Sequence, residues 1–251
     1  PYVVKFHVWT SGIRVEAGAT LTIEPGVVVK FERGTALSSG DGKIVALGTS
    51  AEPIIFTALT DDTIAGDTNG DGTATQPEVA FWLGVRLRNS ADRLEFTELR
   101  YGDFCIDSDQ VLIIKNNKFL DCGAGINIRS GFGGQVSDNE FTNTHHNFSA
   151  VFSSGFFKSL EDVVFERNHF SGWAYGFSFD DLITGQVTIR NNEITNNRFG
   201  FFRLSGGNFL LENNNIFGNL EYGAINFELS SPLPAQNNWW GDASGPFHPT
   251  L

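Results

Sequence analysis

Short apolar segments that end in asparagine recur along the second half of the chain. Residues 111–119, 134–141, 163–170 and 187–194 each alternate apolar and polar positions and then reach Asn. The recurring residues are Asn117, Asn139, Asn168, Asn192, Asn214 and Asn238, at spacings of 22, 29, 24, 22 and 24, and Thr97 occupies the same slot 20 residues earlier. The pattern predicts a structural repeat of about 22 residues.

Each repeat has room for two or three short strands and shows no helical periodicity. A second column follows the asparagines, with a glycine before an apolar residue at Gly125, Gly176, Gly200 and Gly223, and predicts a turn into another strand. A βαβ sheet needs crossover helices, so a chain of this kind must coil on itself. We expect an all-β fold, a single parallel β-helix of roughly ten coils spanning residues 1–251. At the spacing of neighbouring strands the rod would be about 50 Å long.

The asparagine column has two readings. Inward-facing amides stacked at strand spacing can hydrogen-bond along the rod, because each amide is both a donor and an acceptor. Alternatively, asparagine favours turns by tolerating the left-handed conformation. Both readings can hold at one turn, and neither implies catalysis.

The first half of the chain follows the same logic with different residues. Ile13, Val15, Leu21 and Ile23 alternate with polar residues, and Glu24-Pro25-Gly26 predicts a type II turn. The stretches LTIEPGVVVKF (21–31), ALGTSAEPIIFTA (46–58) and NNWWGDASGP (237–246), together with the asparagine repeats, resemble the pectin-lyase-like, right-handed β-helix repeat family of secreted bacterial and archaeal proteins.

The resemblance implies a right-handed coil and a C-terminal closing motif at about 237–249, which contains Trp239, Trp240, Pro246 and Pro249. These tryptophans are expected to stop the stack of coils, and sugar stacking is the alternative. The family includes enzymes, adhesins and proteins of unknown role, so fold does not give activity.

Composition narrows the function. Phe (24) greatly outnumbers Trp (5) and Tyr (4), as expected for rings stacked in an interior where no polar atom needs a partner. A formal net charge of −12 argues against nucleic acid, whose binders carry basic stripes. The scattered Lys and Arg offer no polybasic patch for a membrane surface, and no apolar run predicts membrane insertion.

The cysteines and the absence of methionine concern a possible disulfide and the processing of the chain. Cys105 and Cys122 fall at different positions of neighbouring repeats, which makes a disulfide between them doubtful and leaves their state open. The chain has no Met, which indicates a processed or excised piece of a longer protein, whose leader cannot be inspected.

Residues 61–78 are polar and glycine-rich, and they predict a loop off the rod. The segment satisfies the calcium-loop pattern D-x-[DN]-x-[DN]-G-x5-E, with Gly72 at the sharp turn. No helix-forming sequence flanks it and Pro77 precedes its last ligand, so a sensor-type opening is not expected. A flexible acidic loop without metal is the alternative. The expected calcium ligands are Asp67, Asn69, Asp71, the Thr73 carbonyl, Thr75 through water, and Glu78.

No complete catalytic set is present. The Arg-x-Pro-x-x-Arg signature of pectate lyases is absent, as are the Gly-His-Gly and Arg-Ile-Lys elements of polygalacturonases. Asp180 and Asp181 resemble the paired aspartates of polygalacturonases, and with Arg129 they are the candidate catalytic residues. A polar outward face that would grip sugars, or would simply be solvated, is predicted from Asp107, Asn127, Arg129, Ser178 and Asp180.

Two functions from different classes remain. The first is a non-catalytic, extracellular or cell-surface β-helix module of a larger protein, which binds calcium and serves as an adhesin, a spacer or a surface that contacts a polysaccharide or cell-surface glycan. The second is a polysaccharide lyase or glycoside hydrolase acting on an acidic polysaccharide. Two carboxylates about 5–10 Å apart in a groove would favour the enzyme.

Overall fold

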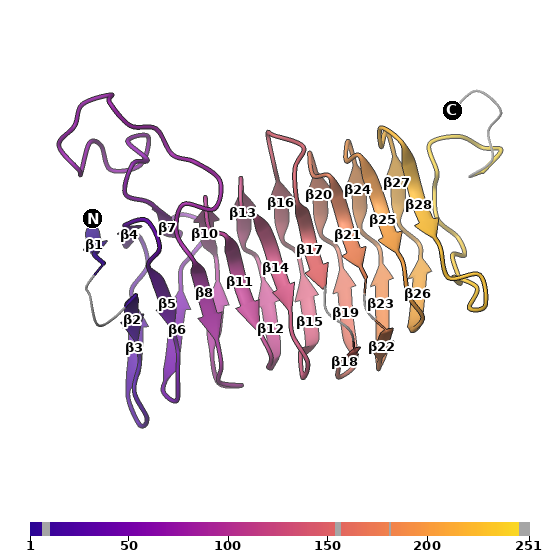
Figure 1. Cartoon of the computed structure of the whole chain (residues 1–251), viewed down its shortest axis with the longest axis horizontal. Coiled ribbons are helices and arrows are strands. Elements are labelled where there is room, and N and C mark those ends of the chain that lie inside the picture. Colours follow the sequence, from indigo (N-terminus) through magenta and orange to yellow (C-terminus); the bar gives the residue numbers. More distant parts are fainter. Residues whose placement is uncertain (7–10, 154–156, 181, 246–251) are drawn as a thin grey trace.

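The chain coils through three parallel sheets, named sheets 1, 2 and 3 in the order in which it enters them (Figure 1). This computed structural model describes residues 1–6, 11–153, 157–180 and 182–245. Within them, sheets 1 and 2 have nine strands each and sheet 3 has eight, close to the roughly ten coils expected. The all-β parallel solenoid is confirmed. Nothing in the described part of the chain is a helix long and apolar enough to cross a membrane.

The strands are three to five residues long. Sheet 1 comprises β1 (Tyr2–Val4), β4 (Val28–Phe31), β7 (Ile54–Ala58), β10 (Thr97–Arg100), β13 (Lys118–Leu120), β16 (Glu140–Thr142), β20 (His169–Ser171), β24 (Glu193–Thr195) and β27 (Asn215–Phe217). Sheet 2 comprises β2 (Gly12–Arg14), β5 (Ala36–Ser38), β8 (Gly84–Leu87), β11 (Phe104–Ser108), β14 (Ala124–Ile128), β17 (Ser149–Ser153), β21 (Tyr175–Phe179), β25 (Phe199–Arg203) and β28 (Tyr222–Asn226). Sheet 3 comprises β3 (Thr20–Ile23), β6 (Lys43–Leu47), β9 (Arg93–Glu95), β12 (Val111–Lys115), β15 (Gly133–Ser137), β19 (Val163–Glu166), β23 (Gln186–Arg190) and β26 (Asn208–Glu212), and β18 (Phe157–Ser159) pairs with β22 (Leu182–Thr184) outside these sheets.

The asparagine column forms a continuous ladder at the corner between sheets 3 and 1. The Oδ1 atom of each ladder residue accepts the backbone N–H of the preceding one over 2.9–3.0 Å, from Thr97 through Asn238. The left-handed conformation belongs to the residue before each ladder position, for example Asn116 (φ 59°) and Asn191 (φ 55°). The hydrogen-bonding interpretation is therefore confirmed for the column. The left-handed conformation falls one residue earlier, so the column asparagines are not there to tolerate it.

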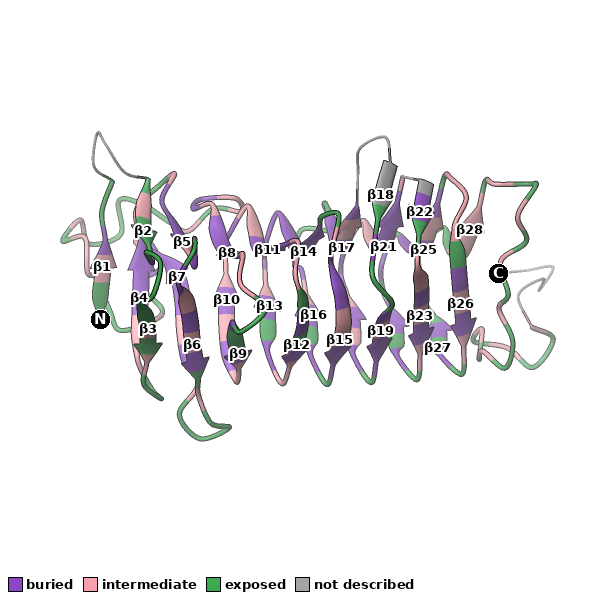
Figure 2. Ribbon diagram, turned by 90° about the horizontal axis from the view of Figure 1, so that it is seen from below, coloured by how far each residue is buried: buried purple, intermediate pink, exposed green. Residues whose placement is uncertain are grey.

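Phenylalanine rings fill the interior as expected. Phe119, Phe141 and Phe170 face inward from consecutive strands of sheet 1, with ring centroids 4.3 and 4.7 Å apart. Buried and exposed positions alternate along many strands, so one side of each sheet faces the core (Figure 2). The core is continuous along the rod, since each inward ring also contacts the coils beside it.

The glycine column differs from the prediction. Gly125, Gly176 and Gly200 are the second residues of β14, β21 and β25, inside the strands rather than at a turn. A Cβ atom at these positions would lie 2.4–2.6 Å from a carbonyl oxygen of the next coil. Glycine is therefore required by the close approach of neighbouring backbones.

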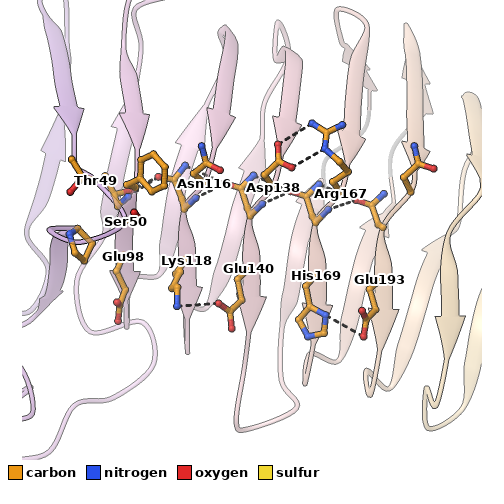
Figure 3. A pocket seen from close by; sticks show the side chains of 18 of the residues that line it. Thr49, Ser50, Glu98, Asn116, Lys118, Asp138, Glu140, Arg167, His169 and Glu193 are labelled. Carbon is orange, nitrogen blue, oxygen red and sulfur yellow. Dashed lines mark hydrogen bonds and ion pairs between the residues drawn. The ribbon is translucent and has the colours of Figure 1, made fainter.

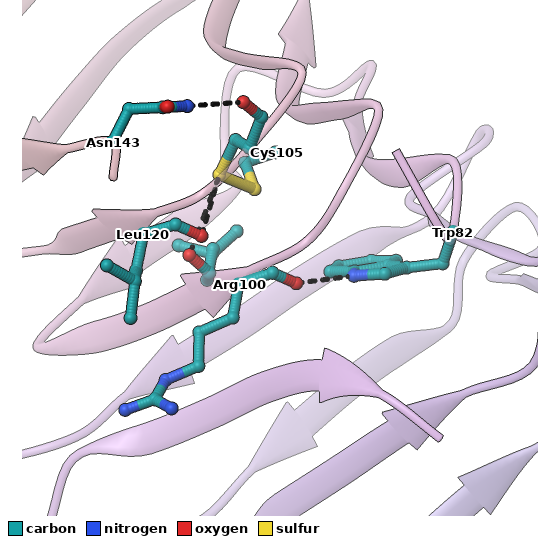
Figure 4. Close-up of a disulfide and its surroundings, with 7 residues drawn as sticks. Trp82, Arg100, Cys105, Leu120 and Asn143 are labelled. Carbon is teal, nitrogen blue, oxygen red and sulfur yellow. Dashed lines mark hydrogen bonds between the residues drawn. A yellow bond between two sulfur atoms is a disulfide. The ribbon is translucent and has the colours of Figure 1, made fainter. Parts of the chain in front are cut away.

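Cys105 and Cys122 form a disulfide, although the sequence made one doubtful. Their Cα atoms lie 5.8 Å apart and both side chains are buried. The corner between sheets 1 and 2 explains the difference. The Gly123 N–H donates to the Gly102 carbonyl, which stacks one corner on the next. At this corner the Cys122 side chain is fully buried and bonded to Cys105 of β11, whose disulfide is drawn in Figure 4.

The predicted type II turn at residues 24–27 is present, and the two tryptophans of the expected closing motif lie beside the last coil. The Val27 N–H donates to the Glu24 carbonyl and Gly26 has φ 73°, as a type II turn requires. At the other end, Trp239 pairs with Asn215 of β27 and Trp240 packs against the core. Pro246 and Pro249 of the closing motif lie outside the described residues.

Candidate functional site

The longest excursion from the rod is the loop between β7 and β8, which contains residues 61–78 (Figure 1). Its base is fixed to the core by Lys30 of β4. This buried side chain donates from Nζ to the carbonyls of Asp61 (2.9 Å) and Gly66 (2.7 Å). The Asp61 carboxylate in turn accepts from Thr57 Oγ1 (2.6 Å). The loop therefore leaves the rod with a defined conformation at its first turn.

Three carboxylates gather within this loop. One oxygen each from Asp62, Asp67 and Asp71 can be chosen so that all three lie within 4.8 Å of one another. Asp67 is held by the backbone, since Oδ2 accepts from Gly72 N (2.8 Å) and Oδ1 from Gly70 N (2.7 Å). The hydrogen bond from Gly72 is the main reason that the pKa of Asp67 is lowered. Asp67 therefore stays charged beside two other acids.

Within residues 61–78, three oxygen atoms are shielded from solvent and have no hydrogen-bond partner. They are Asp62 Oδ1, Asn69 Oδ1 and Asp71 Oδ1. The other oxygen of Asp71 accepts from Asn69 Nδ2 (2.8 Å) and Thr75 Oγ1 (2.6 Å). Unsatisfied oxygens in shielded positions are costly unless something binds them. An all-oxygen set of this kind suits a hard cation such as calcium.

The structure brings some of the predicted calcium ligands together and separates others. Asp67, Asn69, Asp71 and Thr75 lie in contact, whereas Glu78 Oε2 lies 2.6 Å from Arg33 Nη2. Thr73 is exposed. Asp62, which the motif does not include, joins the cluster from the start of the loop.

The outer face of sheet 2 holds the polar residues predicted to bind a ligand. Asp107 is buried, and its carboxylate accepts from Arg88 Nη2 (2.5 Å), Arg129 Nε (2.5 Å) and Asn127 Nδ2 (2.9 Å). Burial acts to raise the pKa of Asp107, but the hydrogen bonds from Arg129 and Arg88 outweigh it and lower the pKa. These groups satisfy one another and form an internal ion-pair network.

The candidate catalytic residues are not brought together. Asp180 follows β21, and Arg129 follows β14 in the same register. Two strand spacings separate them, about 10 Å along the axis, and Arg129 points the other way, to Asp107 on β11. Asp181 lies outside the described residues. Ser178 donates to Asp180 (3.3 Å) and is buried.

Beyond this network, the outer face of sheet 2 becomes aromatic. A hollow of about 620 Å³ is bordered by Phe104, Phe152, Tyr175 and Phe202, which lie on four strands of the sheet. Two acidic residues, Asp103 and Asp180, lie at its borders. Burial raises the pKa of Asp103, and Arg86 partly opposes this effect.

A groove of about 890 Å³ follows the ladder corner and the outer face of sheet 1 (Figure 3). Its charged side chains pair across neighbouring coils. Lys118 lies 3.3 Å from Glu140, His169 lies 3.6 Å from Glu193, and Arg167 contacts both oxygens of Asp138 at 2.8 and 3.0 Å. The Lys118–Glu140 and Arg167–Asp138 pairs offset opposite charges, and all three contacts join adjacent coils.

Comparison with protein-family models matches residues 82–239 to a family described as a right handed beta helix region. The chain belongs to the right-handed beta helix family. The match covers more than half of the chain, and the coil is accordingly right-handed. Neither the curated proteins nor the solved structures contain a match. In this β-helix the acidic loop lies before the matched residues, and the aromatic hollow lies within them.

Two features of this β-helix were missed from its sequence. Asp62 lies outside the calcium-loop pattern, and its signal was the acidic pair Asp61-Asp62 at the loop entry. The aromatic hollow was missed because all phenylalanines were assigned to the core. The signal for it was the spacing of Tyr175, Phe199 and Tyr222, which each precede the column glycine and therefore point outward.

Proposed function

We propose that this chain is a non-catalytic, calcium-binding β-helix module that works outside the cell or at its surface and contacts glycan through the outer face of sheet 2. Calcium binds in the loop 61–78 and holds that excursion against the rod. The rest of the coil is a rigid support. Its length and regular surface suit repeated contact with an extended ligand.

The shielded oxygens of Asp62, Asn69 and Asp71 carry the calcium proposal. A water molecule would satisfy one or two of them, but would not offset three neighbouring carboxylates. A divalent cation offsets their charge and accepts several oxygen ligands at once. Asp67, held charged by backbone N–H groups, adds a further ligand to the same cluster.

The disulfide supports the extracellular setting. Disulfides persist in oxidising compartments and are rare in the cytosol of most organisms. Calcium outside cells is plentiful enough to fill even a weak site. Both features therefore favour the same location. The disulfide stiffens the coil, and calcium stiffens the loop.

The enzyme alternative has less support on sheet 2. Asp103 precedes β11 and Asp180 follows β21, three strand spacings away, so about 14 Å of axial distance separates the two carboxylates. Glycoside hydrolases hold their paired carboxylates about 5–10 Å apart. The Arg129 guanidinium is also engaged by Asp107. These positions favour a binding surface over a lyase or hydrolase.

Thermal melting at fixed ionic strength tests the proposal. With calcium about tenfold above its dissociation constant, the midpoint should rise by about 3–5 °C relative to EDTA. The variant Asp71→Asn should lose this rise. Asp41→Asn, which removes the same charge from an exposed residue outside the loop, should keep it. An unchanged midpoint in the unmodified protein, or an equal rise in the Asp71 variant, would refute the calcium site.

A further inference from the structure

The outer face of sheet 2 has two columns of side chains that run along the rod. Register pairing places Phe104, Ala124, Ser149, Tyr175, Phe199 and Tyr222 in the first column. The second column contains Asp107, Asn127, Phe152, Ser178, Phe202 and Ile225. Aromatic residues therefore dominate the later coils, and the polar network occupies the earlier ones.

Small residues open a hollow between the rings. Ala124 and Ser149 occupy two successive positions of the first column, between Phe104 and Tyr175, so two coils lack a large side chain there. Both small residues are buried at the base of the hollow. The backbones of Phe104 and Tyr175 are three strand spacings apart, or about 14 Å.

The rings around the gap are fixed by contacts with one another. Phe104 and Phe152 lie nearly parallel, with centroids 6.4 Å apart and an interplanar angle of 11°. Tyr175 meets Phe202 edge to face, with centroids 4.9 Å apart, and stacks on Phe199 at 5.1 Å. All of Phe104, Phe152, Tyr175 and Phe202 remain partly exposed. The hollow thus presents ring surfaces whose positions are set before any ligand arrives.

Among the described residues that line the hollow, the polar groups are acceptors and hydroxyls, and none is a cationic side chain. Asp103 and Asp180 are acidic, and Ser149, Ser178 and Tyr175 carry hydroxyls. Anionic chains are disfavoured beside two carboxylates on a protein of net charge −12. The lining suits an occupant that has an apolar face and many neutral hydroxyls.

We propose that the hollow on sheet 2 is a binding site for a neutral oligosaccharide, whose pyranose rings stack on Phe104, Phe152, Tyr175 and Phe202. The C–H bonds on one face of a sugar ring are attracted to the negative face of an aromatic ring. The hydroxyls on its edge donate to carboxylates such as Asp103. Two or three linked pyranose rings span the gap, because each residue of such a chain extends about 5 Å, similar to one strand spacing.

This site identifies the ligand class for the glycan contact proposed above, and it rests on that part of the proposed function. It is independent of calcium, because the loop 61–78 contributes no residue to the hollow. A protein partner is a poorer match, since a stable interface buries about 800 Å² on each side, whereas the apolar lining of the hollow consists of five aromatic rings with Ala124 and Leu204.

Affinity electrophoresis tests the site, with mixed-linkage β-glucan, galactomannan and xylan as neutral probes and polygalacturonate as the anionic probe. At least one neutral polysaccharide should retard the full chain, and polygalacturonate should not. Tyr175→Ala and Phe152→Ala should each weaken the binding about tenfold, since a stacked ring contributes about 1.4 kcal/mol or more. Tyr2→Ala removes an exposed ring elsewhere on the rod and should have no effect.

Several results would overturn the site. Retardation by polygalacturonate alone, binding that both ring variants retain, or no retardation by any neutral probe would each reject it. Self-association in sedimentation experiments that Tyr175→Ala abolishes would identify a second copy as the occupant instead. Thermal melting of both variants must match the unmodified protein, and Phe152→Leu provides a second ring deletion if Phe152→Ala unfolds. The calcium-dependent melting rise is expected in every case, so failure here is distinct from failure of the calcium proposal.

Discussion

Each asparagine of the ladder hydrogen-bonds to backbone groups of neighbouring coils. Asn139 illustrates this role, because its Oδ1 accepts from Asn117 N (2.9 Å) and its Nδ2 donates to the Ile114 carbonyl (2.9 Å) and to Asn168 Oδ1 (3.0 Å). Its side chain is almost fully buried. Each ladder amide therefore satisfies backbone groups of a neighbouring coil that water does not reach.

Asn139→Ala should lower the free energy of unfolding by about 2–4 kcal/mol, because it leaves the Asn117 N–H and the Ile114 carbonyl unpaired inside the rod. Urea denaturation followed by circular dichroism measures the loss. Asn215→Ala is the matched control, since this asparagine points outward on β27, and its effect should stay within about 0.5 kcal/mol. Equal effects of the two substitutions would contradict the ladder's role.

Asp107 should make stability depend on pH. Its pKa is lowered in the folded state, so its contribution is complete above the unfolded pKa of about 4 and is lost as pH falls through the folded pKa. Asp107→Asn should cost about 2 kcal/mol at pH 7, less than a fully buried pair because Arg129 is half exposed. The difference between the two proteins should shrink below about pH 4. A constant difference across that range would show that the charge of Asp107 is unimportant.

At the scale of elements, the corner between sheets 1 and 2 is held by more than strand pairing. The Cys105–Cys122 disulfide joins β11 to the corner that precedes β14. Asn197 and Asn219 form a second, shorter ladder at the same corner in later coils, with the Asn197 N–H donating to Asn219 Oδ1 (3.0 Å). The corner is therefore stabilised by a disulfide in the earlier coils and by asparagine hydrogen bonds in the later ones.

Replacing both cysteines by alanine should destabilise the coil by about 2–4 kcal/mol, because the bridge closes a loop of 17 residues in the unfolded chain. The denaturation midpoint of the Cys105→Ala, Cys122→Ala variant measures this effect. Dithiothreitol should lower the midpoint of the unmodified protein toward the same value and leave the variant unchanged. If the reductant lowers both midpoints equally, the disulfide is not the cause.

Structural features could be predicted from the sequence where one residue type recurs at the same position of successive repeats. Asn117 to Asn238, the Glu24–Val27 turn and the inward phenylalanines follow directly from sequence spacing. The disulfide did not, because Cys105 and Cys122 meet across a corner whose bend cannot be counted in residues. The outward rings of Tyr175 and Phe202 were missed because composition alone does not say which face of a strand a residue occupies.

The candidate calcium site in the loop was likewise only partly predictable from the sequence. The calcium-loop pattern located Asp67, Asn69 and Asp71, which share a short turn whose geometry is local. It did not locate Asp62, and it assigned Glu78 a ligand position although Arg33 of the rod lies beside it. Whether Asp62 and Glu78 lie in the carboxylate cluster depends on contacts between the loop and the coil beneath it.

The whole molecule combines a right-handed rod, an acidic loop near one end and an aromatic hollow on the outer face of one sheet. The ladder and the phenylalanine core keep the rod in one conformation. Among the described residues, the loop is the longest segment that neither the ladder nor the core holds in place. A bound cation should therefore stabilise its conformation more than that of the coils. Calcium is therefore expected to act on the loop and to leave the coils of residues 82–239 unchanged.

Calorimetric titration of calcium into the full chain tests this account most directly. One ion per chain is predicted, with Asp62→Asn weakening binding about tenfold or more and Glu78→Gln changing it less than about twofold. The absence of a binding signal in the unmodified protein would contradict the account. So would binding that Glu78→Gln abolishes and Asp62→Asn leaves intact.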